Sequence, residues 1–304
     1  MHNDANLNDS PNTVTDSTVT DSTVADSTVT DSTVTESTAA NSTAEFVIII
    51  GANSAIGHAF TTQCLKQNQA DNHPQPINLI TISRDDYLHS ADIHHLISQN
   101  KTSSWQHYQC SNLQQDIEHL MNQQIIPQIT TSNGSVSRIL ICNGVLHQGA
   151  IQPEKKIEDI NEANLLALIQ MNTITPMLWL QGLVKLLSKQ RSRVVISILS
   201  ARVGSISDNR LGGWYSYRTS KAALNMLIKT TAIEFARRLK HVKLMAFHPG
   251  TTDTPLSKPF QHNVAEGKLF TPEFVAQQLY NIQSNITLEG QASFIDWAGN
   301  DIQW

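Results

Sequence analysis

Residues 46–57 read FVIIIGANSAIG, a continuously apolar run followed at once by a turn with two glycines. A short apolar run bounded by glycine is typical of a strand that is buried on both faces of a parallel sheet. Gly51 allows a tight turn after the strand, and Gly57 allows the following helix to pack close to it. The free N–H groups at the start of that helix can bind a pyrophosphate. We therefore expect a dinucleotide-binding loop formed by Gly51, Asn53, Ser54, Ile56 and Gly57.

Strand-like and helical segments alternate along the rest of the chain. This alternation predicts an α/β protein, a single-domain Rossmann fold whose doubly wound, mostly parallel sheet has about seven strands. Sheets of this kind bind ligands at the carboxyl ends of their strands. The expected strands are 46–50, 77–82, 105–110, 138–142, 194–198, 242–247 and 292–295, and the expected helices lie near 56–68, 113–124, 160–188, 217–239 and 272–283.

The first forty-odd residues differ in composition from the rest. Between about Thr13 and Thr43 a five-residue unit related to Asp-Ser-Thr-Val-Thr repeats, without aromatic, glycine or basic residues. Such a segment buries too little apolar surface to offset the entropy lost on ordering, so we expect residues 1–44 to be a disordered acidic tail. The tail has seven acidic side chains and the chain a net charge of −5, so residues 45–304 carry about +2. We expect these residues to form one domain.

Composition excludes several classes of function. The near-neutral domain lacks the basic surface that nucleic-acid binding requires, so no nucleic-acid partner is expected. No run of 18 apolar residues occurs, which argues against a membrane span. The first lysine or arginine is Lys66, so the N-terminus does not resemble a secretory signal.

Cysteine and histidine usage indicates an intracellular protein without a metal centre. Cys64, Cys110 and Cys142 are widely spaced and odd in number, which fits free core thiols in the cytoplasm. His94 and His95 are adjacent, so they do not share a helix face, and no Cys-x-x-Cys pair accompanies them. We expect no metal site.

A second motif, Tyr217-Arg-Thr-Ser-Lys221, opens a long helical stretch. Side chains four residues apart share one helix face. A free tyrosine titrates near ~10, and a neighbouring ammonium favours tyrosinate, which lowers that pKa toward the working range. The pair also arises by chance on surface helices. The strand–turn–helix context at 46–57 favours a catalytic acid/base instead.

Three longer stretches carry a resemblance to a known family. They are residues 201–209 (ARVGSISDN), 212–218 (GGWYSYR) and 220–225 (SKAALN), and the chain ending is similar too. The chain resembles the short-chain dehydrogenase/reductase family over residues 46–304, and within it the C-factor-like branch related to small carbonyl reductases. The family's loop is usually Thr-Gly-x-x-x-Gly-x-Gly. Here Ile50 stands in place of the threonine, and Ala55 stands in place of the middle glycine. The methyl group of Ala55 narrows the approach to the phosphates.

The resemblance implies a catalytic tetrad of Asn, Ser, Tyr and Lys. Tyr217 would be the acid/base, Lys221 would hold the nicotinamide ribose and lower the tyrosine pKa, and Asn172 would anchor a water leading to the lysine. The family places its serine three residues before a glycine, where this chain has Ala201. We expect Ser200, one position earlier, to take the serine role, with Ser205 as the weaker substitute.

The resemblance also implies cofactor contacts after each strand. Arg84, after the second strand, suits the 2′-phosphate of NADP, whereas the following Asp85 and Asp86 favour NAD; we expect NADP, with NAD less favoured. Asn112 would offer an acceptor oxygen near the adenine. The remaining expected contacts are Asn143, Gly144, Tyr217, Lys221, Pro249, Gly250, Thr251, Thr252 and Thr254.

The implied activity is NADP-dependent interconversion of a carbonyl and an alcohol on a small molecule. Residues 255–271 would form a substrate lid. The helices at 160–188 and 217–239 carry apolar stripes that would suit a homodimer or homotetramer. A non-catalytic NAD(P)-binding sensor or signalling protein is the alternative, because Ala201, Ala55 and Cys142-Asn143 depart from the family pattern.

Overall fold

The computed structural model describes residues 44–70, 76–99 and 103–304. All but the last residue of the expected tail 1–44 therefore lies outside the described residues. Within them, seven parallel strands form one sheet in the order β3-β2-β1-β4-β5-β6-β9, which confirms the expected α/β Rossmann fold. The strands are β1 (Glu45–Ile50), β2 (Ile77–Ser83), β3 (Ser104–Gln109), β4 (Ser135–Ile141), β5 (Val194–Leu199), β6 (Val242–His248) and β9 (Ser293–Asp296).

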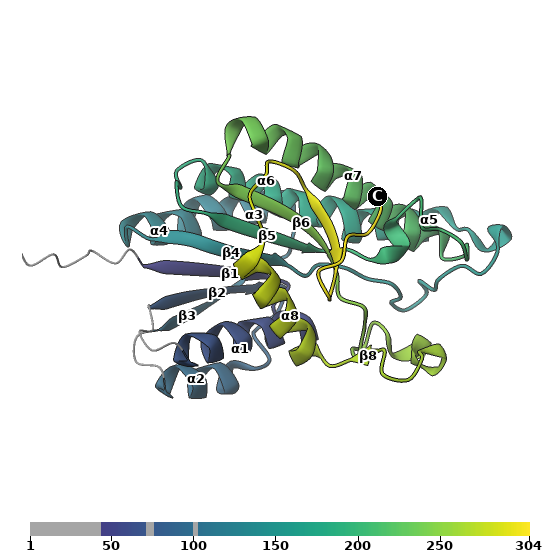
Figure 1. Ribbon diagram of the computed structural model, residues 1–304, viewed down its shortest axis with the longest axis horizontal. Coiled ribbons are helices and arrows are strands. Elements are labelled where there is room, and N and C mark those ends of the chain that lie inside the picture. The colour runs from purple at the N-terminus through teal and green to yellow at the C-terminus, as the bar shows by residue number, and fades with distance from the viewer. Residues whose placement is uncertain (1–43, 71–75, 100–102) are drawn as a thin grey trace, which may run out of the picture. The chain divides into compact units, whose positions relative to one another are not determined.

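Helices cover both faces of the sheet, and β1 shows why. Successive strand side chains point to opposite faces. Ile48 and Ile50 pack into one buried cluster, and Val47 and Ile49 into another. One face is covered by α1 (Ala55–Ala70), α2 (Ser90–Gln99) and α8 (Pro272–Asn285), and the other by α3 (Gln114–Leu120), α4 (Ile126–Thr131), α6 (Thr175–Leu187) and α7 (Tyr215–Arg238) (Figure 1).

The strand order fixes where a ligand can bind. From β1 the chain passes to β2 and β3 on one side, then returns to β4 on the other side of β1. The connections after β1 and β4 therefore diverge and leave a crevice at the carboxyl ends of these two strands. Both loops that follow them were expected to bind a cofactor.

The structure corrects several expected element boundaries. Helix α2 was not expected, although Ile93, Leu96 and Ile97 follow a helical spacing and face the core. The helix expected at 113–124 continues to Thr131 through a π-helical turn, η1 (Met121–Ile125). The helix expected at 160–188 consists of α5 (Glu162–Ile169), a π-helical turn η3 (Gln170–Ile174) and α6.

The segment expected to be a lid contains short ordered elements. It holds a 3-10 helix, η5 (Lys258–Asn263), and a two-residue strand, β8 (Leu269–Phe270), which pairs with β7 (Thr251–Thr252). Across the described ranges, the structure contains no helix of the length and apolarity needed to cross a membrane.

Candidate active site

Two adjoining cavities lie at the carboxyl ends of the strands. The outer cavity, about 450 Å³, lies along the loops after β1, β2, β3 and β4. The inner cavity, about 110 Å³, lies against the loops after β5 and β6 and the start of α7. Both are lined by Cys142, Asn143 and Gly144, so these three residues form a shared wall. A ligand that fills the outer cavity can therefore extend into the inner one.

The glycine loop is closed tightly on itself. Gly51 has a φ of +79°, which favours glycine, and a Cβ there would lie 3.2 Å from the Cys142 backbone. A Cβ on Gly57 would lie 2.8 Å from the Gly51 carbonyl oxygen and from Ser54 Oγ. Gly57 thus lets the first turn of α1 lie close to the two residues that leave β1, Gly51 and Ala52. The Gly57 N–H donates to Ser54 Oγ at 3.1 Å.

Asn53 joins this loop to the segment after β2. Its Nδ2 donates to Ser83 Oγ at 3.1 Å and to the Asp86 carbonyl oxygen at 2.8 Å. Its Oδ1 accepts from the Leu88 N–H at 3.0 Å. Asn53 and Ser54 line the outer cavity, and Ile56 lines the inner one. The Asn53 amide therefore holds the chain that carries Arg84.

The residues after β2 present both charges to the outer cavity. Arg84 is exposed and lines the cavity, and Asp85 lies beside it. The Asp86 carboxylate accepts from Gln109 Nε2 at 2.6 Å and does not line the cavity. No ion pair joins Arg84 to an acidic side chain in the described part of the chain. Its guanidinium is therefore available to an anionic ligand.

Two asparagines at the outer cavity differ in what they can offer a ligand. Asn112 lines the cavity, but its Oδ1 accepts from Trp179 Nε1 at 2.7 Å. The buried indole N–H thus takes one lone pair of the expected acceptor, and the second lone pair stays open to a ligand. Asn143 Oδ1 is buried and has no hydrogen-bond partner among the described residues. A buried acceptor without a partner, such as Asn143 Oδ1 at the wall of both cavities, fits a ligand that donates a hydrogen bond to it.

These features together fit a nicotinamide dinucleotide. The glycine loop leaves backbone N–H groups for phosphates, Arg84 is available to a further phosphate, and Asn143 offers an unused acceptor. Arg84 and the glycine loop line the outer cavity, and Asn143 lines the wall that it shares with the inner cavity. A nicotinamide dinucleotide that runs from the outer to the inner cavity would meet them in this order.

Tyr217, Lys221 and Ser200 all line the inner cavity. Lys221 Nζ donates to the Leu199 carbonyl oxygen at 2.8 Å and lies 5.9 Å from the centre of the Tyr217 ring. Burial lowers the pKa of Lys221 to about 8. Burial also raises the pKa of Tyr217 above its ordinary value. The expected lowering of the tyrosine pKa by the lysine is therefore not found, because desolvation of the phenol dominates.

The two candidate serines occupy different places. Ser200 Oγ lies at the inner cavity and donates to Asn225 Oδ1, at 2.6 Å, one turn beyond Lys221 on α7. Ser205 is buried, and its Oγ accepts from the Asp208 N–H at 3.1 Å. Ser205 lines neither cavity. Only Ser200 is close enough to the inner cavity to meet a ligand there.

Asn172 braces the site from behind. It is fully buried in η3, where its Oδ1 accepts from the Val145 N–H at 2.6 Å. Its Nδ2 donates to the Val145 carbonyl oxygen at 2.8 Å and to Ser220 Oγ at 3.0 Å. These bonds join the loop after β4 to the residue before Lys221, and Asn172 lines neither cavity.

The loop after β6 closes the inner cavity. Pro249, Gly250, Thr252 and Thr254 line it, whereas Thr251 pairs with Leu269 instead. A Cβ on Gly250, whose φ is +73°, would lie 2.7 Å from the Phe270 ring. A larger residue there would displace β8.

An aromatic cluster that the sequence did not reveal lies beside Tyr217. The ring of Trp214 meets that of Tyr217 edge-on, with centres 6.2 Å apart, and lies 5.0 Å from Phe260. His147 lies 5.8 Å from Phe260, and its Nε2 contacts the Leu256 carbonyl oxygen at 3.1 Å. The residue before α7 and the expected lid thus give the tyrosine an apolar, aromatic neighbourhood.

Similarity to known proteins agrees with this geometry. The chain is 26% identical over 254 residues to benzil reductase ((S)-benzoin forming) of Bacillus cereus, covering 78% of this chain and 93% of that protein. It is 27% identical to C-signal of Myxococcus xanthus over 146 residues, which is 48% of this chain and 82% of that protein. The fold matches an NADPH-bound carbonyl reductase from chicken fatty liver with a TM-score of 0.67 and 20% identity, covering 86% of this chain and all of that one.

The chain also matches a whole protein family over more than half of its length. Residues 45–265 match the family described as short chain dehydrogenase, and this range holds the glycine loop, the Tyr217–Lys221 pair and the threonine loop. The chain belongs to the short-chain dehydrogenase family and is an oxidoreductase of the carbonyl-reductase-like kind.

Proposed function

We propose that this protein is an NADP-dependent reductase that interconverts a small carbonyl compound and its alcohol. One observation carries the proposal: Tyr217, Lys221 and Ser200 meet at the inner cavity, which shares a wall with the outer, cofactor-sized cavity. A proton donor and a cofactor's reactive end would therefore be neighbours.

The cofactor would be held along both cavities. The glycine loop would contact the pyrophosphate, Asn143 would accept from the ligand at the shared wall, and Pro249, Gly250, Thr252 and Thr254 would contact its nicotinamide end. Arg84 would bind the 2′-phosphate, which supports NADP over NAD. When bound, NADPH supplies a hydride to the carbonyl carbon of the substrate.

The chain's own residues would manage the proton and the developing charge. Tyr217 Oη would donate its proton to the carbonyl oxygen as the alcohol forms. Burial raises the pKa of Tyr217, which keeps the phenol protonated but makes it a weaker acid, so the proton transfer would depend on a neighbouring positive charge. The nearby Lys221 ammonium would stabilise the resulting phenolate. The Ser200 hydroxyl, which donates to Asn225 Oδ1 here, would turn to donate to the same carbonyl oxygen.

The aromatic cluster supports an apolar, aromatic carbonyl substrate. Trp214 and Phe260 lie next to Tyr217 and would pack on a substrate ring. Two similar proteins, from Bacillus cereus and Bacillus subtilis, are benzil reductases. An aromatic diketone is therefore the first substrate to try.

Exposed apolar side chains support assembly into a homodimer or homotetramer. Leu166, Ile174, Met226 and Ile233 are 40–62% exposed, and they lie on the α5–η3 segment and on α7. Covering them in a symmetric interface would remove apolar surface from water. The three cysteines are all buried free thiols, which supports the cytoplasm as the site of action.

A non-catalytic NAD(P)-binding sensor is the second candidate. Ala201 stands at the family's serine position, the Ser200 hydroxyl donates to Asn225, and the chain is similar to C-signal. The two candidates differ in turnover. NADPH consumption would be measured with benzil and a panel of aldehydes, ketones and quinones. Turnover that is lost in Tyr217→Phe supports the reductase, and NADPH binding without turnover on any of them supports the sensor.

A further inference from the structure

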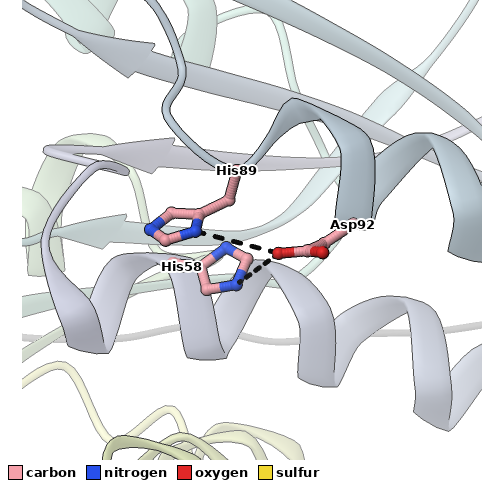
Figure 2. A group of neighbouring side chains, drawn as sticks. All are labelled: His58, His89 and Asp92. Carbon is pink, nitrogen blue, oxygen red and sulfur yellow. Dashed lines mark ion pairs between the residues drawn. The ribbon is translucent and has the colours of Figure 1, made fainter.

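Two histidines and an aspartate form a cluster between α1 and α2, apart from both cavities. His58 belongs to α1, His89 immediately precedes α2, and Asp92 lies in the first turn of α2 (Figure 2). His58 Nε2 and His89 Nδ1 each lie 3.8 Å from the same oxygen, Asp92 Oδ2. These three atoms all lie within 4.8 Å of one another. None of the three residues lines the outer or the inner cavity.

Tyr87 lies at the far nitrogen of the His58 ring. Its hydroxyl oxygen and His58 Nδ1 are 3.0 Å apart. When Nδ1 carries the ring proton it donates to this oxygen, and Nε2 then has the free lone pair that a metal ligand needs.

In this tautomer His58 Nε2 turns its lone pair toward the Asp92 carboxylate. Two acceptors that face one another repel, and a cation between them removes the repulsion. The 3.8 Å separation is also too long for a hydrogen bond. His89 Nδ1 approaches the same oxygen at the same distance (Figure 2). His58 Nε2, His89 Nδ1 and Asp92 Oδ2 thus surround one small space, with the His58 and His89 rings stacked at its side, their centres 3.9 Å apart.

We propose that His58, His89 and Asp92 bind one Zn²⁺ or similar divalent transition-metal ion, with water completing its coordination. Atoms about 2.1 Å from a tetrahedral Zn²⁺ lie about 3.4 Å from one another, so the observed gaps close when the His58 and His89 rings rotate out of their stack and turn both nitrogens to the ion. Two imidazoles and one carboxylate suit zinc, cobalt or nickel better than calcium or magnesium. Tyr87 holds the far nitrogen of His58, as partners of metal-binding histidines do.

The ion would join α1 to the segment after β2. Asn53 Oδ1 already holds the Leu88 N–H of that segment, and Arg84 lies at its other end beside the outer cavity. A metal bond at His89 would add a second attachment next to Leu88. Because the ion binds only the folded arrangement of α1 and α2, it should stabilise the protein.

The test is a calorimetric titration of the full-length, chelator-treated protein with ZnCl₂. We expect one saturable site per chain, and Asp92→Asn and His89→Gln should each weaken it at least ~10-fold. Both positions are exposed enough to accept these changes, and melting curves in chelator would confirm folding. His95→Gln, an exposed histidine on the same helix outside the cluster, is the matched control and should leave affinity unchanged.

Two further readouts separate this site from background binding. Co²⁺ should give the visible absorption of a tetrahedral nitrogen–oxygen site in the unaltered protein and in His95→Gln, but not in Asp92→Asn. Zn²⁺ should raise the melting temperature of the unaltered protein and not that of Asp92→Asn. Equal Zn²⁺ affinity in His89→Gln, Asp92→Asn and His95→Gln, or no saturable binding, would overturn the proposal.

Discussion

Lys221→Met should stabilise the protein while removing its proposed activity. Lys221 is 2% exposed, and its burial lowers the pKa from 10.5 to about 8. The charged form is therefore held in the folded state against a desolvation penalty. Methionine has a similar length and carries no charge, so it removes that penalty and also removes the ammonium beside Tyr217.

The magnitude follows from the pKa and from one hydrogen bond. At 1.36 kcal/mol per pKa unit, the lowered pKa of Lys221 corresponds to about 3 kcal/mol of lost stability at pH 7. The variant also loses the bond from Nζ to the Leu199 carbonyl oxygen, which costs about 1–2 kcal/mol. We expect Lys221→Met to be more stable than the unaltered protein by about 1–2 kcal/mol at pH 7.

The difference should depend on pH in a defined direction. Between pH 8 and 10.5 the unfolded chain keeps a proton on Lys221 that the folded protein has released, so the stability of the unaltered protein rises with pH there. Methionine does not titrate, so the stability of the Lys221→Met variant lacks this dependence on pH. The advantage of the variant is thus full below pH 8 and disappears as the pH rises toward 10.5.

Urea unfolding at pH 7 and near pH 10 would measure the difference in unfolding free energy between Lys221→Met and the unaltered protein. Lys240→Met, at an exposed lysine, is the control and should shift the unfolding free energy by less than about 0.5 kcal/mol at both. A Lys221→Met protein that is less stable at pH 7, or whose advantage is the same at both pH values, would refute the reasoning.

Three further predictions address the cofactor, the serine and the tail. Arg84→Ala should weaken NADPH binding by roughly ten- to a hundredfold and NADH binding little, because only NADPH has the 2′-phosphate; equal affinity of the unaltered protein for both would exclude this role. Ser200→Ala should lower kcat by ~10²-fold, whereas Ser205→Ala, away from the cavity, should change it little; the reverse pattern would move the role to Ser205. Removing residues 1–44 should leave Tm and kcat/KM unchanged, since the repeat has no core-forming period; a clear loss in either would show that the tail contributes to the folded protein.

Much of the fold was predictable because it depends on local apolar pattern. The run at 46–50 is β1, and each other expected strand matches an observed one within about three residues. Helix α2 was missed although Ile93, Leu96 and Ile97 carry the helical spacing that packs it on the core. The apolar face is short, only three residues in ten, and polar residues surround it.

The parts of the site that follow from the order of motifs along the chain were predictable. The properties that depend on the burial of a side chain were not. The glycine loop and the Tyr217–Lys221 pair reach the two cavities as their order along the chain predicted. The raised pKa of Tyr217 and the use of Asn112 by Trp179 depend on residues distant in sequence. The His58 cluster was missed for the same reason, although the spacing of His89 and Asp92 on one helix turn was visible.

Tyr217→Phe tests the central claim most directly. The rate of NADPH oxidation in a single turnover would be compared between the unaltered protein and this variant, with NADPH affinity measured separately. Tyr215→Phe, two residues away and lining neither cavity, is the control. We expect the rate to fall at least ~10²-fold in Tyr217→Phe, with NADPH affinity nearly unchanged. A Tyr217→Phe rate within a few-fold of the unaltered protein would contradict it.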